Sequence, residues 1–185
     1  MIVYDIETLC TESTAVVLSL AAVYFDPNDT LDYDELLDRA LFVKFDVSEQ
    51  IKKYNRTVDK SAVEWWRKQA DIPRKASVEP SPNDLSLAEG LSMMDDYYNR
   101  NGRGVVWARG GLDQLATESL YKSLGAKPFA MFNMWRDVRT AIDLLYDSKN
   151  GYCSVPGFDP SIHVFKHHPV HDCAYDAMML VHGQA

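Results

Sequence analysis

The chain has 185 residues, of which 46 % are hydrophobic and 25 % are charged, and its formal net charge is −8. This length predicts a single domain over residues 1–185 with a sizeable core, and no run is long and apolar enough to cross a membrane. The negative net charge argues against a protein that coats nucleic acid of any sequence.

The N-terminal part of the chain predicts strands. Residues 2–4 are a short apolar run that leads into Asp5, residues 15–25 are β-branched and apolar, and residues 41–45 alternate in character. We expect a strand over each segment, with an acidic loop over residues 26–38.

The remainder predicts helices and one further strand. Ser61 with Glu64, and Ser86 with Glu89, have the spacing of capping boxes. The expected helices cover residues 61–69, 86–101, 113–124 and 134–146, followed by a last helix capped by Asp172. A strand is expected over residues 105–109, and loops over residues 72–84 and 148–170. This order predicts an α/β fold with a mixed central sheet flanked by helices.

Two further features concern charge and compartment. Residues 52–75 carry eight basic and three acidic side chains, which would steer a polyanion to one place or simply form a solvated helix face. Asp5 and Glu7 interrupt the region where a signal peptide needs its apolar run. The three cysteines are an odd, widely spaced set, so we expect reduced thiols in a cytoplasm-like compartment.

The stretch YDIET places Asp5 and Glu7 two residues apart on an extended segment. Side chains at this spacing point to the same side of a strand, and adjacent carboxylates repel each other unless a cation or proton lies between them. Oxygen ligands favour Mg²⁺ or Mn²⁺ over zinc. The pattern is a candidate metal site, although alone it also fits an ordinary strand end whose acids face water.

Three later residues are candidates for the same site. Asp113 follows a Gly-Gly turn at a helix start, where an aspartate also serves as a cap. His171 and Asp176 lie five residues apart, which on a helix separates them by about 140°. They converge only if His171 lies in the entering loop and Asp172 is the cap. A histidine so placed could deprotonate a water; otherwise it is a surface histidine beside a capped helix.

The order of these motifs resembles the DEDD superfamily of 3′–5′ exonucleases, in the branch whose general base is histidine. The matching residues are Asp5, Glu7, Asp113, His171 and Asp176. Asp172 stands where the tyrosine branch has its tyrosine. The segments VEWWRKQ, WRDVRT and HDCAYD look like the phage exonuclease A group, and the likeness runs over nearly the full chain.

The resemblance implies an RNase H-like fold and a metal-dependent exonuclease that releases nucleoside 5′-monophosphates from the 3′ end of single-stranded DNA. Two Mg²⁺ or Mn²⁺ ions would be held by four carboxylates, and His171 would be the general base. The carboxylates are Asp5, Glu7, Asp113 and Asp176. A phage origin would place the enzyme in the host cytoplasm. We expect no membrane among its binding partners.

Four residues are candidates for substrate binding: Thr8, Leu9, Trp66 and Arg139. The first two follow the paired acids and contact the terminal nucleotide in the family. Trp65 and Trp66 point about 100° apart on a helix, so one can be core while the other stacks on a base. Arg136 and Arg139 would contact phosphate or form a salt-bridged helix start.

Three alternatives remain open. An exoribonuclease acting on RNA 3′ ends has the same catalytic set, and the 2′-OH contacts that decide the substrate cannot be read from the sequence. A catalytically inactive nucleic-acid-binding module would normally have lost one of the acids. A zinc-stabilised interaction domain would use four histidines, although no cysteine pair supports it. These are His163, His167, His168 and His171.

Overall fold

Five strands form a mixed sheet in the part of the chain that the computed structural model describes, residues 1–28, 30 and 32–184. The strand order is β3-β2-β1-β4-β5. The strands are β1 (Ile2–Thr8), β2 (Val17–Tyr24), β3 (Leu41–Lys44), β4 (Val106–Ala108) and β5 (Trp135–Asp137). β2 is antiparallel to β1 and β3, whereas β4 is parallel to β1 and β5. The predicted α/β class with a mixed sheet is confirmed, and it is consistent with an RNase H-like fold.

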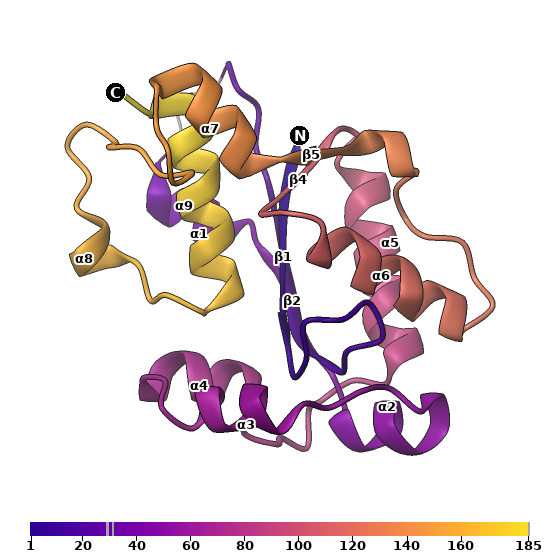
Figure 1. The fold of residues 1–185 in the computed structure, drawn as a ribbon. Helices are drawn as coiled ribbons and strands as arrows, with labels where there is room; N and C mark the ends of the chain where they lie inside the picture. Colours follow the sequence, from indigo (N-terminus) through magenta and orange to yellow (C-terminus); the bar gives the residue numbers. More distant parts are fainter. Residues whose placement is uncertain (29, 31, 185) are drawn as a thin grey trace.

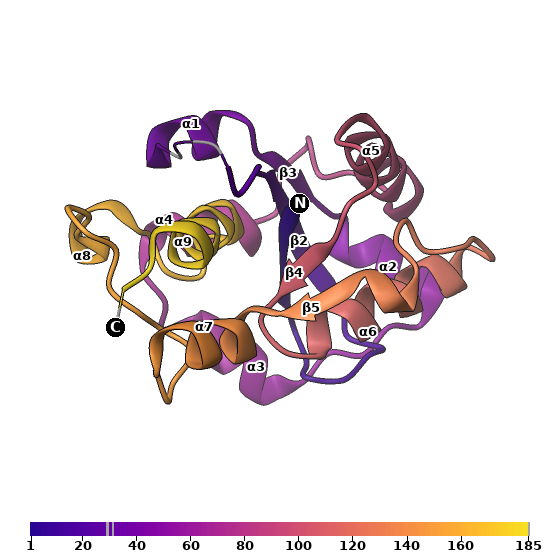
Figure 2. The same cartoon turned by 90° about the horizontal axis from the view of Figure 1, so that it is seen from above.

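Helices cover both faces of this sheet (Figures 1 and 2). They are α1 (Tyr33–Asp38), α2 (Val47–Tyr54), α3 (Lys60–Trp66), α4 (Asp71–Ser77), α5 (Leu87–Arg100), α6 (Leu112–Ser123), α7 (Val138–Tyr146), α8 (Pro160–His163) and α9 (Pro169–His182), with the 3-10 helix η1 (Phe132–Met134). One face carries α5 and α6, and the other carries α9 with α1 and α7. Helices α2, α3 and α4 lie at the end of the sheet where β1 ends (Figure 1).

The alternation of β1 assigns its side chains to the two faces. Tyr4 and Ile6 belong to the core beneath α5 and α6, and Val3 belongs to the core beneath α9. Because successive strand residues point to opposite faces, Asp5 and Glu7 follow Val3 to the α9 side. The prediction that both acids share one face is confirmed, and β1 runs on through them to Thr8.

Several predicted loops contain short helices. The acidic segment 26–38 holds α1, which Asp32 caps by accepting from two backbone N–H groups; Asp29 and Leu31 lie outside the described residues. The segment 72–84 overlaps α4, in which Pro73 occupies the first turn, where a missing N–H costs little. The segment 148–170 holds α8, and α2 was not predicted.

One of the predicted helix starts is confirmed and two are wrong. The capping box of Ser86 and Glu89 is present. The box predicted at Ser61 is wrong, because Asp59 caps α3 and accepts from Ser61 N. The predicted helix over 134–146 is wrong in its first residues, since β5 pairs with β4 there and α7 begins only after the cap Asp137.

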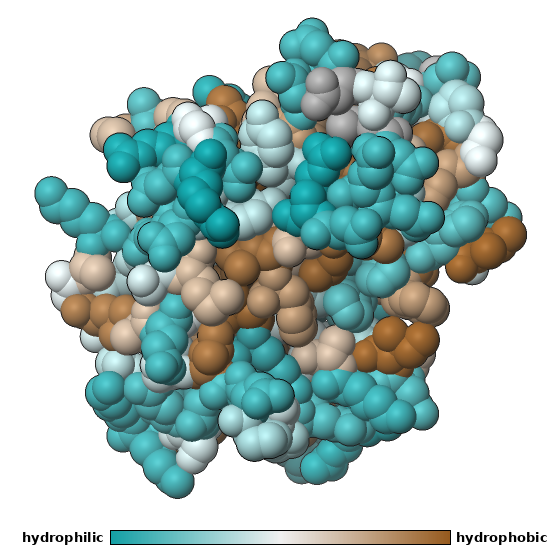
Figure 3. Space-filling model, turned by 180° about the vertical axis from the view of Figure 1, so that it is seen from behind, coloured by the Kyte–Doolittle hydropathy of each residue, from teal (hydrophilic) through white to brown (hydrophobic). Residues whose placement is uncertain are grey.

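The surface behind the view of Figure 1 is largely hydrophilic, with hydrophobic residues gathered across its centre (Figure 3). None of the described helices is both long enough and apolar enough to cross a membrane.

Candidate active site

A cavity of about 350 Å³ opens between β1, the start of α6 and α9. Its lining is unusually rich in charged groups. The acids are Asp5, Glu7, Asp113, Asp172 and Asp176, and the basic side chains are Arg109, Arg139, Lys166 and His167. Tyr152 and Tyr175 provide aromatic walls. The cavity therefore collects carboxylates from segments that lie far apart in the sequence.

Asp113 is tied directly to the strand that carries the paired acids. It lies in the first turn of α6, and its Oδ1 accepts a hydrogen bond of 3.2 Å from the backbone N–H of Ile6, between Asp5 and Glu7. The side chain is buried, with 6 % exposed. The predicted convergence of these three acids is seen in the structure.

Helix α9 supplies two further carboxylates from one face. Asp172 lies in its first turn and Asp176 follows one turn later, so both face the cavity. Their partners differ. Asp172 Oδ2 accepts from the backbone N–H of His167 at 2.9 Å, whereas Asp176 is in an ion pair with Arg109 at 2.7 Å.

The histidine at this site is His167. The liganding atoms of Glu7, His167 and Asp172 all lie within 4.8 Å of one another. His167 directly precedes the cap of α9 and has a left-handed backbone, with φ of 65°. The His167 ring therefore lies just before the N-terminus of α9, close to Asp172 in the first turn of that helix.

The structure does not bring His171 to the cavity. The predicted cap at Asp172 is wrong, because His168 caps α9 and Pro169 is its first residue. His171 and Asp176 are both helical, and at about 140° apart they cannot converge. Instead, His171 Nδ1 lies 2.8 Å from the Tyr33 hydroxyl. The condition for convergence is met one turn earlier, by His167 and Asp172.

The carboxyl groups of the site resist ionisation in the absence of a cation. Burial raises the pKa of Asp5 and Glu7 well above the ordinary values, and the neighbouring carboxylates raise it further. Burial likewise raises the pKa of Asp113 and of Asp172 to about 7. It also raises the pKa of Asp176, which the Arg109 guanidinium opposes.

This donor set fits a divalent cation. Oxygen-rich sites of carboxylates suit Mg²⁺ and Mn²⁺, and a cation would relieve the mutual repulsion that raises the pKa values. The zinc site of four histidines is not supported by the described residues. His171 bonds to Tyr33, and His168 stacks on Phe42 at 5.6 Å between ring centroids.

The predicted substrate-binding residues are only partly near the cavity. Arg139 lines it, whereas Thr8, Leu9 and Trp66 do not. Leu9 and Trp66 belong to a small core, and Trp66 Nε1 donates to the backbone oxygen of Thr8 at 3.0 Å. Arg136 donates to backbone oxygens near its own strand.

Trp65 is the exposed member of the tryptophan pair. It is 42 % exposed, against 2 % for Trp66. Its ring meets the ring of His167 edge to face, with 4.8 Å between centroids. An aromatic surface therefore adjoins the histidine of the site.

His167 and Asp172 were expected elsewhere, as a zinc-ligand alternative and as a helix cap, and Arg109 was not predicted at all. A signal for the first two was present, since they have the same five-residue spacing as His171 and Asp176. Pro169 is typical of the first helical position, which would have favoured the earlier pair. For Arg109 we find no local signal.

Comparisons with known proteins agree on the chemistry. The model of the 3′–5′ exoribonuclease Rv2179c-like domain matches residues 1–182. An exodeoxyribonuclease of Enterobacteria phage T4 is 30 % identical over 205 residues, covering 96 % of this chain and 86 % of that protein. The chain therefore belongs to the 3′–5′ exoribonuclease Rv2179c-like family of DEDD-type exonucleases, and it is a 3′–5′ exonuclease.

Proposed function

We propose that residues 1–185 form one domain that removes nucleotides from the 3′ end of single-stranded DNA. The observation that carries this assignment is the convergence of Glu7, His167 and Asp172 in one cavity with two more acids from β1 and α6. The exodeoxyribonuclease of phage T4, similar over most of the chain, supports DNA as the substrate.

Four carboxylates would hold Mg²⁺ or Mn²⁺, as a pair of ions. They are Asp5, Glu7, Asp113 and Asp172. The ions would supply Lewis-acid polarisation of the phosphate and stabilise the oxygens of the attacking and leaving groups. The protein contributes the fixed positions of the ligands, which come from a strand, a helix start and the first turn of a second helix.

His167 is the general base in this proposal. Burial lowers its pKa below the ordinary value, and Lys166 lowers it further, so the ring is largely neutral near pH 7. It accepts a proton from the attacking water as the water oxygen bonds to phosphorus. The bond from phosphorus to the 3′ oxygen of the preceding nucleotide breaks, that oxygen takes a proton, and a nucleoside 5′-monophosphate leaves.

Two kinds of side chain would hold the nucleic acid. Arg139 and Lys166 line the cavity and offer positive charge to phosphates, which moderates the surplus of acids. Trp65 offers an exposed ring beside His167 on which a base can stack.

The test is degradation of 5′-labelled single-stranded DNA with Mg²⁺ or Mn²⁺. We expect a ladder that shortens from the 3′ end and that EDTA or Glu7→Gln abolishes. Glu12→Gln is the matched control, because Glu12 is an exposed acid on the loop after β1. Retained DNA binding without turnover by the wild-type protein would instead favour the inactive binding module.

An RNA substrate is the second candidate, because the family description names an exoribonuclease. Labelled RNA of the same sequence, compared by kcat/KM with the DNA, decides between them. A clear preference for RNA would contradict the DNA proposal while leaving the catalytic residues unchanged.

A further inference from the structure

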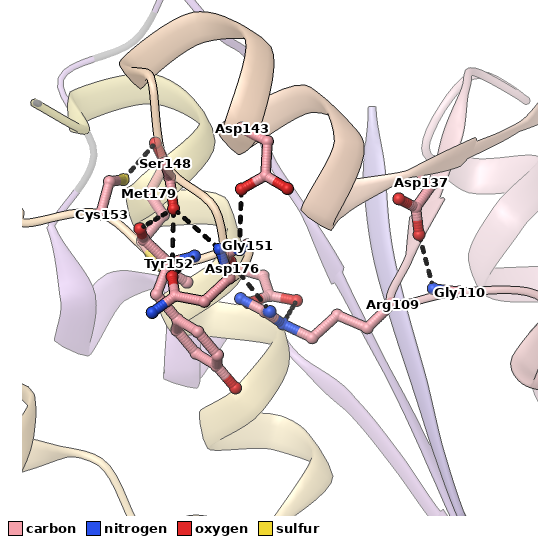
Figure 4. A network of polar contacts seen from close by, with 11 residues as sticks. Arg109, Gly110, Asp137, Asp143, Ser148, Gly151, Tyr152, Cys153, Asp176 and Met179 are labelled. Carbon is pink, nitrogen blue, oxygen red and sulfur yellow. Dashed lines mark hydrogen bonds and ion pairs between the residues drawn. The ribbon is translucent and has the colours of Figure 1, made fainter.

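Arg109 and Asp176 form a buried ion pair at one wall of the cavity (Figure 4). Arg109 Nε donates to both carboxylate oxygens of Asp176, at 2.8 and 2.9 Å, and a second nitrogen lies 2.7 Å from Oδ1. The side chains are only 13 % and 7 % exposed. The Nε–H group is thus shared between the two oxygens, and the second nitrogen is in ion-pair contact with Asp176 without a hydrogen bond of its own.

The same guanidinium also anchors the loop before α8. Arg109 donates to the backbone oxygen of Gly151 at 3.0 Å, and its Cζ lies 4.1 Å from the centroid of the Tyr152 ring. Gly151 has φ of 71°, and a Cβ there would come within 2.7 Å of Arg139 Cβ. The loop backbone therefore lies between Arg109 and Arg139, and position 151 has room only for glycine.

Both members of the pair are close in sequence to carboxylates of the site. Arg109 directly follows β4 and lies four residues before Asp113, across the Gly110–Gly111 turn. Asp176 lies one helical turn after Asp172. The pair thus joins the chain segment that carries one acid of the site to the helix that carries another.

The contacts of Asp176 make it a poor ligand for a cation. Both of its oxygens accept from the Arg109 guanidinium, and a positive group in direct contact opposes the binding of a second one to the same carboxylate. We propose that Arg109 and Asp176 are positioning residues, which set the spacing of Asp113 and Asp172 for metal binding. The inference rests on the proposed function of the cavity.

The test uses variants that separate folding from metal binding. The double variant Arg109→Met/Asp176→Leu removes both charges, and replacing a buried ion pair by apolar side chains often preserves stability. Arg109→Lys keeps the charge but loses the planar guanidinium, whose Nε reaches both oxygens of Asp176. Arg74→Met is the matched control, since Arg74 pairs with two acids outside the cavity.

The measurements are Mn²⁺ binding by calorimetry, the melting temperature, and kcat and KM on single-stranded DNA. We expect the double variant to melt near the wild type but to bind Mn²⁺ about tenfold more weakly, with kcat lowered about 10–100-fold, as when residues that orient metal ligands are changed. KM for DNA should change little. Arg109→Lys should lie between the two, and Arg74→Met should match the wild type.

Two results would overturn the proposal. Wild-type Mn²⁺ affinity and kcat in the folded double variant would show that the pair only stabilises the fold. Loss of one bound Mn²⁺ in Asp176→Asn, with both retained in Arg109→Lys, would show that Asp176 is itself a ligand. Calorimetry needs no turnover, so a wild-type protein that binds Mn²⁺ without degrading DNA would contradict the proposed function alone.

Discussion

The backbone of His167 is unusual for a residue with a side chain. Its φ of 65° lies in the left-handed region, which costs a residue other than glycine of order 1–3 kcal/mol. The hydrogen bond from its N–H to Asp172 helps to hold this conformation. Such strain at a cavity of carboxylates is what we expect where the position of a ring matters more than local stability.

The two candidate histidines give a matched comparison. We expect His167→Asn to lower kcat about 10²–10⁴-fold, the range for loss of a general base, with little change in melting temperature because asparagine tolerates the left-handed region. His171→Asn should keep most of the activity and lose about 1 kcal/mol of stability with its bond to Tyr33. Activity lost in His171→Asn but kept in His167→Asn would reverse the assignment.

The tryptophan pair should separate binding from stability. Trp65→Ala is expected to weaken single-strand binding by about 1–3 kcal/mol, seen as a higher KM, because an exposed stacking surface is removed. Trp66→Ala should cost about 3–5 kcal/mol of unfolding free energy, because it empties a core position. Urea unfolding and steady-state kinetics of both variants check this, and an unchanged KM in Trp65→Ala would remove Trp65 from the substrate path.

Among the elements, α5 lies against β3 through Gly90. A Cβ at this position would collide with the Phe45 ring and come within 2.7 Å of Val43 Cγ1. Gly90→Ala gains up to about 1 kcal/mol of helix propensity, but overpacking costs about 1–3 kcal/mol. We expect a net loss of stability in urea unfolding. Ser92→Ala, on the exposed side of α5, is the control and should be neutral or slightly stabilising.

The start of α7 predicts a pH dependence. Burial alone would raise the pKa of Asp137, but hydrogen bonds from Thr140 and from the backbone of Gly110 lower it below the ordinary value. The stabilisation is therefore complete above about pH 4, the unfolded value, and is lost as the pH falls through the folded pKa.

Asp137→Asn tests this linkage. At pH 7 we expect it to lower the unfolding free energy by about 1 kcal/mol, the usual loss at a helix cap. The difference from the wild type should shrink as unfolding is measured at pH 5, 4 and 3. A difference that stays constant over this range would show that the charge of Asp137 contributes nothing.

For the whole molecule, the acids in the cavity predict a stability that depends on metal. Binding to the folded state alone contributes about 2.7 kcal/mol at a metal concentration 100 times the dissociation constant, which is about 5–10 °C in melting temperature for a chain of this size. We expect Mn²⁺ or Mg²⁺ to raise the melting temperature and EDTA to reverse the change. Glu7→Gln should melt higher than the wild type without metal, because the cost of burying an ionisable group beside other carboxyl groups is gone, and should respond less to metal.

Local patterns predicted much of the fold. The strands β1, β2 and β3 and the capping box of α5 were predicted because alternation and caps act between residues that are close in sequence. β5 was not predicted because its three residues lie inside a run with helical periodicity and are too few to show the alternation of a strand. Its strand state comes from pairing with β4, a neighbour that only the folded sheet provides.

The candidate active site could likewise be predicted only in part. The alternation of β1 was enough to place Asp5 and Glu7 together, and the turn before α6 was enough to suggest Asp113. Two equivalent histidine–aspartate spacings near the C-terminus could not be separated by spacing alone. Which histidine reaches the cavity depends on where α9 begins. It also depends on Tyr33 of α1, whose hydroxyl is hydrogen-bonded to His171 although the two residues lie far apart in the sequence.

Residue order and periodicity therefore account for the class of the sheet, the paired acids and the expectation of a divalent metal. The folded chain accounts for His167 at the site, for the partner of Asp176 and for the exposure of Trp65. The reason is physical: periodicity and capping depend on a few neighbouring residues, whereas Arg109 and Asp176 meet across 67 positions of the sequence. Such pairs form only when packing brings their segments together.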